Sequence, residues 1–209
     1  MGSEMCIRDR LMPMTKDLSH LLPQVIEIAR SAGQLILDIY EKKQYEAYTK
    51  SDETPVTSAD IAAHKLITER LSELTPDIPV LSEEAADISL EQRAQWERYW
   101  LVDPLDGTQE FIARSGDFAT IIALIDNNKP TMGVVYGPVS GVTYYAYNGK
   151  GAWKIPDMSE SVKIHTHKHE QPGQNIAIAI SRRQDINRIT SRMSSCLLYT
   201  SDAADDSLR

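Results

Sequence analysis

The sequence predicts an α+β fold in which a pair of N-terminal helices packs against an antiparallel sheet. Two patterns carry this prediction: apolar residues recur every three or four positions before about residue 75, and at every second position from about residue 118 onward. The composition agrees with a globular protein, because 42% of the 209 residues are hydrophobic and 25% are charged. Global disorder and fibrous repeats are thereby excluded.

Two long helices are predicted in the N-terminal half. The first covers residues 18–39, where apolar side chains form one continuous stripe. The second begins after Thr57 or Ser58, both of which are suitable N-caps, and it ends before Pro76. This start places Asp60 in the first turn of the second helix.

Strands follow the helices. Apolar runs at residues 79–81 and 100–102 predict two short buried strands, and residues 91–99 between them predict a short polar helix. The alternating pattern then predicts strands at residues 118–126, 131–136, 142–147, 152–155 and 175–180. Helices followed by such a meander are typical of helix layers packed on a sheet.

Both ends of the chain differ from the sequence between them. Residues 1–10 show no apolar period, residues 194–209 show no helix or strand pattern, and both strings resemble translated sequencing-adapter fragments. We therefore expect a non-native head and tail, with a genuine disordered head and tail as the alternative. Between them we expect an N-terminal α+β domain at residues 11–160 and, at residues 161–193, the start of a second α/β domain whose layer is largely missing.

Charge and cysteine content narrow the class of function. Thirty acidic residues against 22 basic ones give a net charge of −8, which argues against binding to a nucleic-acid polymer. No stretch reaches the roughly 18 apolar residues of a membrane span, and the N-terminus has no signal-peptide core, so a cytoplasmic location is expected. Cys6 and Cys196 are too few to form a disulfide framework.

Acidic residues follow the two short predicted strands. Glu83 comes after the first strand, and Asp103 and Asp106 come after the second. Carboxylates beside buried segments are costly unless a cation or hydrogen bonds stabilise them. Hard oxygen ligands suit Mg²⁺ far better than zinc, so these acids predict a magnesium site. The structural alternative is a solvated turn at Glu83-Glu84 and a capped loop at residues 103–108.

The loop after the second strand also offers a phosphate-binding element. The backbone N–H groups of Gly107 and Thr108 are expected at the start of a helix, where the positive end of the helix dipole favours an anion. Acids for a metal beside amides for a phosphate, taken together with Asp60, are typical of metal-assisted phosphoester hydrolysis.

Three segments resemble the signature motifs of the inositol monophosphatase superfamily, a group of Mg²⁺-dependent, lithium-sensitive phosphatases. In family order they are PVTSAD at residues 55–60, LSEE at residues 81–84 and WLVDPLDGTQEF at residues 100–111. Over residues 18–183 the chain is most similar to the bacterial 3′(2′),5′-bisphosphate nucleotidases of this superfamily. The later Trp-Asp-x-x-Ala segment of the family does not occur in the sequence, so we expect the natural protein to continue past about residue 193.

The resemblance implies a fold, a reaction and roles for individual residues. The fold is the layered α/β sandwich of the sugar-phosphatase type, and the reaction removes the 3′-phosphate of adenosine 3′,5′-bisphosphate in sulfur assimilation and nucleotide recycling. About two or three Mg²⁺ ions are implied as cofactors, with inhibition by Li⁺ and Ca²⁺. The implied metal ligands are Asp60, Glu83, Asp103, the Leu105 carbonyl and Asp106. The implied catalytic residues are Asp60 and Thr108, and the implied substrate contacts are Glu83, Leu105, Asp106, Gly107 and Thr108.

Other functions stay open at this point. The enzymatic alternatives are an inositol-1-phosphate phosphatase and a fructose-1,6-bisphosphate phosphatase. The alternative from another class is a non-catalytic paralogue that binds phosphate or metal and releases no product. The expected partner is a small phosphorylated nucleotide, and the expected location is the cytoplasm, including the cytoplasmic face of the inner membrane.

Overall fold

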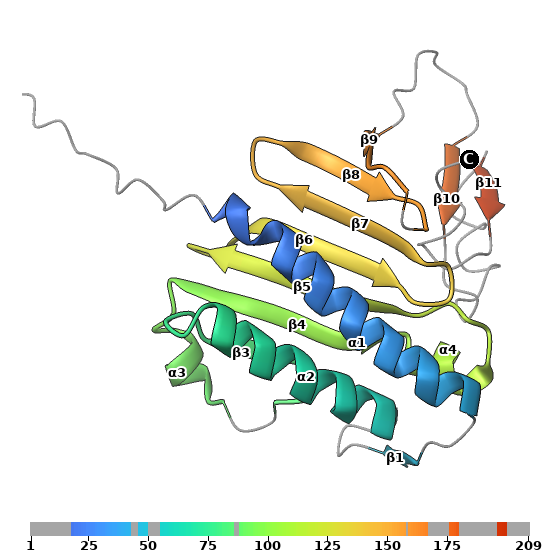
Figure 1. Cartoon of the computed structure of the whole chain (residues 1–209), viewed down its shortest axis with the longest axis horizontal. Coiled ribbons are helices and arrows are strands. Elements are labelled where there is room, and N and C mark those ends of the chain that lie inside the picture. Colours follow the sequence, from blue (N-terminus) through green and yellow to red (C-terminus); the bar gives the residue numbers. More distant parts are fainter. Residues whose placement is uncertain are drawn as a thin grey trace, which may run out of the picture.

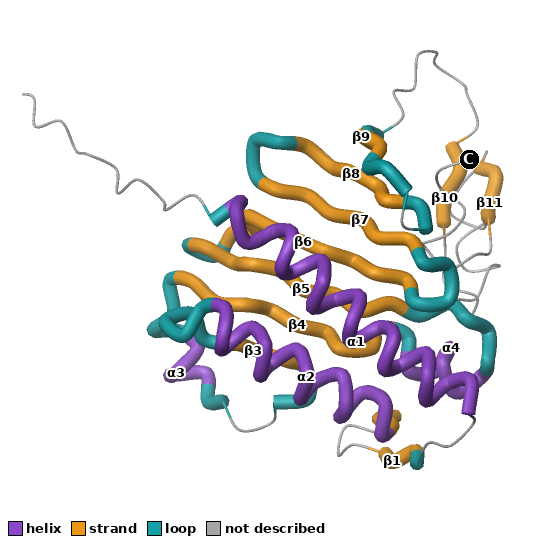
Figure 2. The backbone as a smooth tube through the Cα atoms, in the orientation of Figure 1, coloured by secondary structure: helices purple, strands orange, loops and turns teal. Residues whose placement is uncertain are grey.

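The computed structural model describes residues 18–42, 46–49, 55–85, 88–157, 159–166, 176–179 and 196–199. In this part of the chain two long helices lie side by side across one face of a seven-stranded sheet (Figures 1 and 2). The predicted α+β architecture, with a helix pair packed on a sheet, is confirmed.

The long helices bury the apolar stripes expected from the sequence. A short 3₁₀ turn, η1 (Ser19–Leu21), leads into α1 (Leu22–Lys42), and α2 spans Ser58–Leu74. The buried side of α1 consists of Val25, Ile28, Ala29, Ala32, Gly33, Ile36 and Tyr40. Gly33 is required where α1 approaches the sheet, because a Cβ there would lie 2.4 Å from the Tyr136 ring. Among the helices of the described residues, none is long and apolar enough to span a bilayer.

The sheet is mixed rather than purely antiparallel. Its strands, in spatial order, are β3 (Val80–Ser82), β4 (Arg98–Asp106), β5 (Ala119–Asp126), β6 (Lys129–Gly137), β7 (Val142–Tyr147), β8 (Gly151–Ile155) and β9 (Val162–Ile164). Neighbours from β4 to β9 are antiparallel, whereas β3 runs parallel to β4. The prediction of an antiparallel sheet was wrong at this pair, because the connection between β3 and β4 is long enough to return the chain to the same end of the sheet.

The core lies between the helix pair and one face of the sheet. Fully buried side chains on this face are contributed by β4, β5 and β6: Trp100, Val102, Ile122, Leu124 and Val134. Leu101, between two of these residues, points to the other face and is 42% exposed. The period of two in the sequence therefore marks the core face correctly.

The segment predicted as a helix at residues 91–99 divides into two elements. α3 (Leu90–Arg93) is a single turn with a capping box between Ser89 and Gln92, and β4 already begins at Arg98. The residues that start β4 pair with β5, so strand pairing outweighs the polar helical pattern at the end of this segment.

β4 also extends beyond its predicted end at residue 102. It continues to Asp106, with a shift in its register against β5 between Asp103 and Asp106. Pro104 lies within the shifted part, and its carbonyl oxygen accepts a hydrogen bond from the Thr120 hydroxyl at 3.0 Å. Proline lacks an N–H and occurs in strands at such irregular positions.

Two short strand pairs lie outside the seven-stranded sheet. β1 (Ala47–Thr49) is antiparallel to β2 (Pro55–Thr57), and β10 (Ile176–Ala179) is parallel to β11 (Cys196–Tyr199). β10 confirms the predicted strand at residues 175–180. The expectation of no strand at residues 194–209 was wrong, because residues 196–199 form β11. Their sequence, CLLY, is an apolar run suited to a strand, and it pairs with β10. Residues 1–10 lie outside the described residues, and the domain boundaries stay predictions.

Candidate functional site

The start of α2 holds the Asp60 carboxylate in one orientation. Thr57 is the N-cap of this helix, and its side chain accepts a hydrogen bond from the Ala59 N–H at 3.2 Å. Asp60 Oδ2 in turn accepts hydrogen bonds from the Thr57 N–H at 2.7 Å and from the Thr57 hydroxyl at 2.5 Å. This capping box confirms the predicted place of Asp60 in the first turn and leaves the residue only 2% exposed.

The other oxygen of Asp60 binds the Thr108 hydroxyl. Thr108 Oγ1 donates to Asp60 Oδ1 at 2.9 Å and lies 3.2 Å from the Leu105 carbonyl oxygen. Thr108 is the first residue of α4 (Thr108–Ala113), whose N-cap, Gly107, has a φ of +93°. A Cβ at position 107 would lie 2.9 Å from the Asp117 carbonyl oxygen, so backbone angle and space both require glycine.

Aromatic packing connects α4 to the end of α1. The rings of Tyr40, Phe111 and Phe118 form a cluster with centroid separations of 5.2, 5.0 and 5.3 Å. The Arg114 guanidinium, at the C-terminal end of α4, lies 3.6 Å from the centroid of the Tyr40 ring and donates a hydrogen bond to the Tyr40 carbonyl oxygen. These contacts hold α4, and with it Thr108, in place.

The parallel pairing of β3 with β4 places Glu83 beside Asp103. Ser82 is in register with Val102, and the Glu83 N–H donates to the Val102 carbonyl oxygen at 2.9 Å. Because the two strands run in the same direction, the residues that follow Ser82 and Val102 emerge at the same edge. The two carboxylates predicted at strand ends are therefore neighbours, and Glu83 lies within hydrogen-bonding reach of Asp103.

Burial and neighbouring negative charges raise the pKa values of Asp103 and Asp106. Burial, followed by the negative charges of Glu83 and Asp106, raises the pKa of Asp103 from 3.8 to about 7, while a hydrogen bond from the Leu105 backbone opposes this change. Burial is also the main cause that raises the pKa of Asp106, and the charges of Glu83 and Glu110 add to it. The site thus concentrates negative charge in a partly dehydrated place.

The residues present fit a divalent cation chemically. Their donors are hard oxygens, their like charges repel one another, and Asp103 Oδ1 is buried without a hydrogen-bond partner. Within the described residues, however, no three His, Cys, Asp or Glu side chains already have an arrangement that could hold a metal ion. Glu83, Asp103 and Asp106 interact as neighbours, and their convergence on one Mg²⁺ stays a prediction.

The carboxylates of Glu83, Asp103 and Asp106 form an acidic group. Leu105 connects this acidic group to the Asp60–Thr108 pair. Its N–H donates to the Asp103 carboxylate, and its carbonyl oxygen lies beside the Thr108 hydroxyl. All residues predicted for the site therefore lie in two linked groups, one at the ends of β3 and β4 and one between α2 and α4.

A pocket of about 420 Å³ lies next to the acidic group. Glu83, Asp103 and Arg93 line it together with apolar side chains from β3, β4 and β5. The Arg93 Nε donates to the Ile88 carbonyl oxygen at 2.9 Å, which holds this cation at the pocket wall. Of the predicted site residues, Glu83 and Asp103 line this pocket.

Sequence reasoning missed one polar contact of the site. His64 Nδ1 lies 2.8 Å from the hydroxyl of Ser82, the residue before Glu83. The available signal was the spacing of four residues between Asp60 and His64, which places both side chains on neighbouring turns of one helix.

The sequence of the chain is similar to those of known proteins. A sequence model of the Inositol monophosphatase family matches residues 17–201. The 3′(2′),5′-bisphosphate nucleotidase CysQ of Salmonella typhimurium is 57% identical over 135 residues, which make up 64% of this chain and 54% of that protein. The protein of the same name from Aggregatibacter actinomycetemcomitans is 40% identical over 181 residues, 87% of this chain and 66% of the relative. The chain thus spans about half to two thirds of the length of these relatives.

Solved structures agree with the sequence comparison. CysQ from Bacteroides thetaiotaomicron matches with a TM-score of 0.70 and 32% identity, over 88% of this chain and 73% of that one. The Thermotoga maritima IMPase matches with a TM-score of 0.69 over 87% and 69% of the two chains; at 23% identity it supports the fold alone. The predicted α+β sandwich is confirmed by these neighbours.

Proposed function

The chain belongs to the inositol monophosphatase family, and from this premise we propose that it carries the metal and phosphate site of a phosphomonoesterase. The proposed reaction removes the 3′-phosphate of adenosine 3′,5′-bisphosphate and gives AMP and phosphate. The observation that carries the proposal is the 2.9 Å hydrogen bond from Thr108 to Asp60, linked through Leu105 to the neighbouring carboxylates of Glu83 and Asp103.

The proposed substrate follows from the names of two similar relatives. Both nucleotidases described above act, by name, on 3′(2′),5′-bisphosphates, and they share 57% and 40% of the aligned residues with this chain. Inositol 1-phosphate and fructose 1,6-bisphosphate are the competing substrates, because an IMPase shares the fold at lower identity.

The acidic group is proposed to hold Mg²⁺. Glu83, Asp103, Asp106 and the Leu105 carbonyl oxygen would supply ligands for one ion, and Asp60 would face a second. When bound, Mg²⁺ lowers the pKa of a coordinated water and neutralises charge on the phosphoryl oxygens. Inhibition by Li⁺ and Ca²⁺ belongs to the same proposal.

Thr108 is proposed to orient the attacking water. Its hydroxyl hydrogen has two acceptors within reach, Asp60 Oδ1 at 2.9 Å and the Leu105 carbonyl oxygen at 3.2 Å. With the hydrogen donated to either one, the hydroxyl oxygen can accept a hydrogen bond from a water molecule. Asp60 is itself fixed by two hydrogen bonds from Thr57, which prevents the carboxylate from rotating away. A water held in this way is restricted in orientation before it attacks, and its proton has a path through Thr108 toward Asp60.

Phosphate binding and bond cleavage complete the proposal. The backbone N–H groups of Gly107 and Thr108 are the proposed contacts to the phosphoryl oxygens. The water oxygen forms the new bond to phosphorus in line, the bond from phosphorus to the 3′-oxygen breaks, and the 3′-oxygen takes up a proton. No covalent phosphoenzyme is expected, because the acids nearest the phosphate are assigned to the metal.

The cellular setting is proposed from the substrate alone. A free nucleotide bisphosphate is a small intracellular metabolite, so we place the reaction in the cytoplasm and in sulfur and nucleotide metabolism. No observation on the described residues supports a peripheral position at the inner membrane.

Phosphate release tests this function. The complete protein encoded by the gene that contains this sequence is assayed with adenosine 3′,5′-bisphosphate, inositol 1-phosphate and fructose 1,6-bisphosphate, in Mg²⁺ and in EDTA. We expect the nucleotide to be hydrolysed with the highest kcat/KM and EDTA to abolish release. Preference for a sugar or inositol phosphate would refute the substrate, and tight nucleotide binding without release would favour the non-catalytic paralogue.

A further inference from the structure

We propose that His64 is a positioning residue that acts through Ser82 to hold Glu83 beside Asp103. The proposal rests on the function proposed above, because these two carboxylates are assigned to Mg²⁺. Among the described residues, the hydrogen bond of His64 is to Ser82, and not to a carboxylate or to a proposed substrate contact. His64 is proposed to affect the position of Glu83 through its hydrogen bond to Ser82, the last residue of β3.

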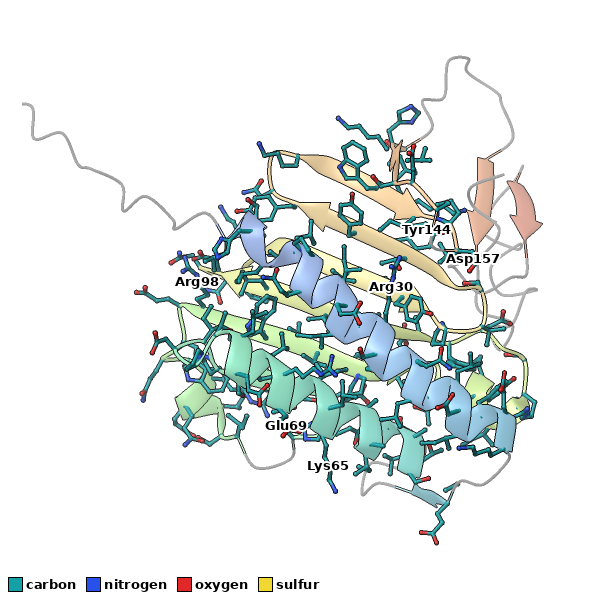
Figure 3. The ribbon with its side chains drawn as sticks, in the orientation of Figure 1. Arg30, Lys65, Glu69, Arg98, Tyr144 and Asp157 are labelled. Atoms are coloured by element: carbon teal, nitrogen blue, oxygen red, sulfur yellow. The ribbon has the colours of Figure 1, made fainter. Side chains whose placement is uncertain are left out.

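The hydrogen bond joins α2 to the last residue of β3. His64 Nδ1 lies 2.8 Å from Ser82 Oγ, and Ser82 is only 3% exposed. His64 follows Asp60 by four residues, so both reach the site from the same side of the helix. Lys65 and Glu69 lie on the outer side of α2 and are exposed (Figure 3). One helix therefore fixes the Thr108 hydroxyl through Asp60 and the end of β3 through His64.

β3 has few contacts of its own to hold its end in place. It has three residues, and in the described sheet it pairs with β4 alone. Directly after Ser82 the chain turns, with a hydrogen bond from the Ala85 N–H to the Ser82 carbonyl oxygen at 3.0 Å. Glu83 lies within this turn, so a displacement of Ser82 moves the Glu83 carboxylate as well.

Electrostatic repulsion acts against this arrangement. The negative charges of Glu83 and Asp103 oppose the proximity of these side chains in a partly buried place. The bond from the Glu83 N–H to the Val102 carbonyl oxygen at 2.9 Å is a backbone contact that holds Glu83 at the end of this three-residue edge strand. The bond between His64 and Ser82 holds the residue that precedes Glu83, so it adds a side-chain contact that resists separation of the two carboxylates. Either tautomer of the imidazole permits the bond, because a hydroxyl can donate or accept.

The variants separate positioning from general stability. His64→Leu and Ser82→Ala each remove the bond, whereas His64→Asn retains a polar atom close to the position of Nδ1. Thr75→Val is the matched control: it removes the 2.8 Å hydrogen bond from Trp100 Nε1 to Thr75, which joins the other end of α2 to β4. The control loses a similar contact between the end of α2 and the sheet, at β4 rather than β3, without touching the strand end that carries Glu83.

Amide hydrogen exchange on this chain without metal tests the positioning directly. We expect His64→Leu and Ser82→Ala to accelerate exchange of the Glu83 N–H about tenfold or more, relative to the Asn148 N–H, which follows β7 and donates to the Thr131 carbonyl oxygen of β6 at 2.8 Å. His64→Asn should restore slow exchange, and Thr75→Val should not change the ratio. An unchanged ratio in both His64→Leu and Ser82→Ala overturns the proposal.

Mn²⁺ binding, measured by calorimetry and electron paramagnetic resonance, tests the consequence for the metal. We expect both bond-removing variants to weaken Mn²⁺ binding about tenfold or more, His64→Asn to remain within about threefold of the original chain, and the double variant to show no further loss. Equal weakening by Thr75→Val would overturn the role of His64. Absence of Mn²⁺ binding in the unchanged chain would instead refute the proposed function, and the exchange ratio would still decide whether His64 positions Glu83.

Discussion

Replacement of Gly107 by alanine tests whether the loop that carries Thr108 can accommodate a Cβ atom at position 107. Gly107 has φ +93° and ψ +38°, a conformation that costs a residue with a Cβ on the order of 1–2 kcal/mol. The new Cβ would also lie 2.9 Å from the Asp117 carbonyl oxygen and 3.3 Å from the Phe118 Cα, both backbone atoms that cannot rotate away. The loop must therefore shift, and the Thr108 hydroxyl must move relative to Asp60.

A second glycine supplies the control for the backbone angle. Gly149, in the turn between β7 and β8, has a φ of +77°, and a Cβ there would meet nothing within 4 Å. Gly149→Ala should cost only the conformational energy, about 1–2 kcal/mol of unfolding free energy. Gly107→Ala adds the steric conflict, so we expect a loss of about 2–4 kcal/mol.

Two assays measure these effects. Urea unfolding of this chain, followed by tryptophan fluorescence, gives the unfolding free energies, and phosphate release by the complete protein gives kcat. We expect kcat to fall by about tenfold or more in Gly107→Ala, because the geometry of the 2.9 Å bond to Asp60 is lost, and to stay unchanged in Gly149→Ala. Equal stability losses in the two variants, or unchanged kcat in Gly107→Ala, would refute the reasoning.

Three further variants or conditions test the site. Thr108→Val keeps the shape of the side chain and removes its hydroxyl; kcat should fall about 10²- to 10⁴-fold with little change in KM, and an equal rise in KM would contradict the orienting role. Asp106→Asn should lower turnover by orders of magnitude and weaken Mg²⁺ binding in calorimetry, with the unfolding free energy nearly unchanged; near-normal phosphate release would show that the metal assignment is wrong. The pKa of Asp103 is raised from 3.8 to about 7, so the folded chain binds more protons than the unfolded chain between these pH values. In EDTA, the contribution of Asp103 to the unfolding free energy is therefore full below about pH 3.8 and is lost as the pH rises through 7. Thermal melts of Asp103→Asn across this pH range should show a smaller loss of stability with rising pH. An unchanged loss would show that Asp103 does not cause it.

The sequence predicted the parts of the site that depend on local chemistry. The N-cap at Thr57 and the place of Asp60 follow from the residue types at a helix start, which need little tertiary information. The acids Glu83 and Asp103 were recognisable because they end short apolar runs, where a charge needs compensation. Helix capping and the placement of acids at strand ends can be predicted because both depend on residues within a few positions of one another in the chain.

The parts that were wrong or missed depend on partners distant in the chain. The polar segment at residues 91–99 has a helical pattern, but its last residues gain more from pairing with β5. The parallel pairing of β3 with β4 and the contact of His64 with Ser82 arise only when α2 and both strands are packed together. No local pattern distinguishes these outcomes from their alternatives.

The most direct test of the site is a crystal structure of this chain soaked in Mn²⁺, with anomalous diffraction data collected at the manganese absorption edge. The structure predicts a peak between Glu83, Asp103 and Asp106, within about 2.5 Å of oxygen atoms from each and of the Leu105 carbonyl. It also predicts that the Thr108 hydroxyl keeps its bond to Asp60 beside that ion. A map without a peak there, or with Glu83 turned away from Asp103, would contradict the central claim that these residues form one metal-dependent phosphatase site.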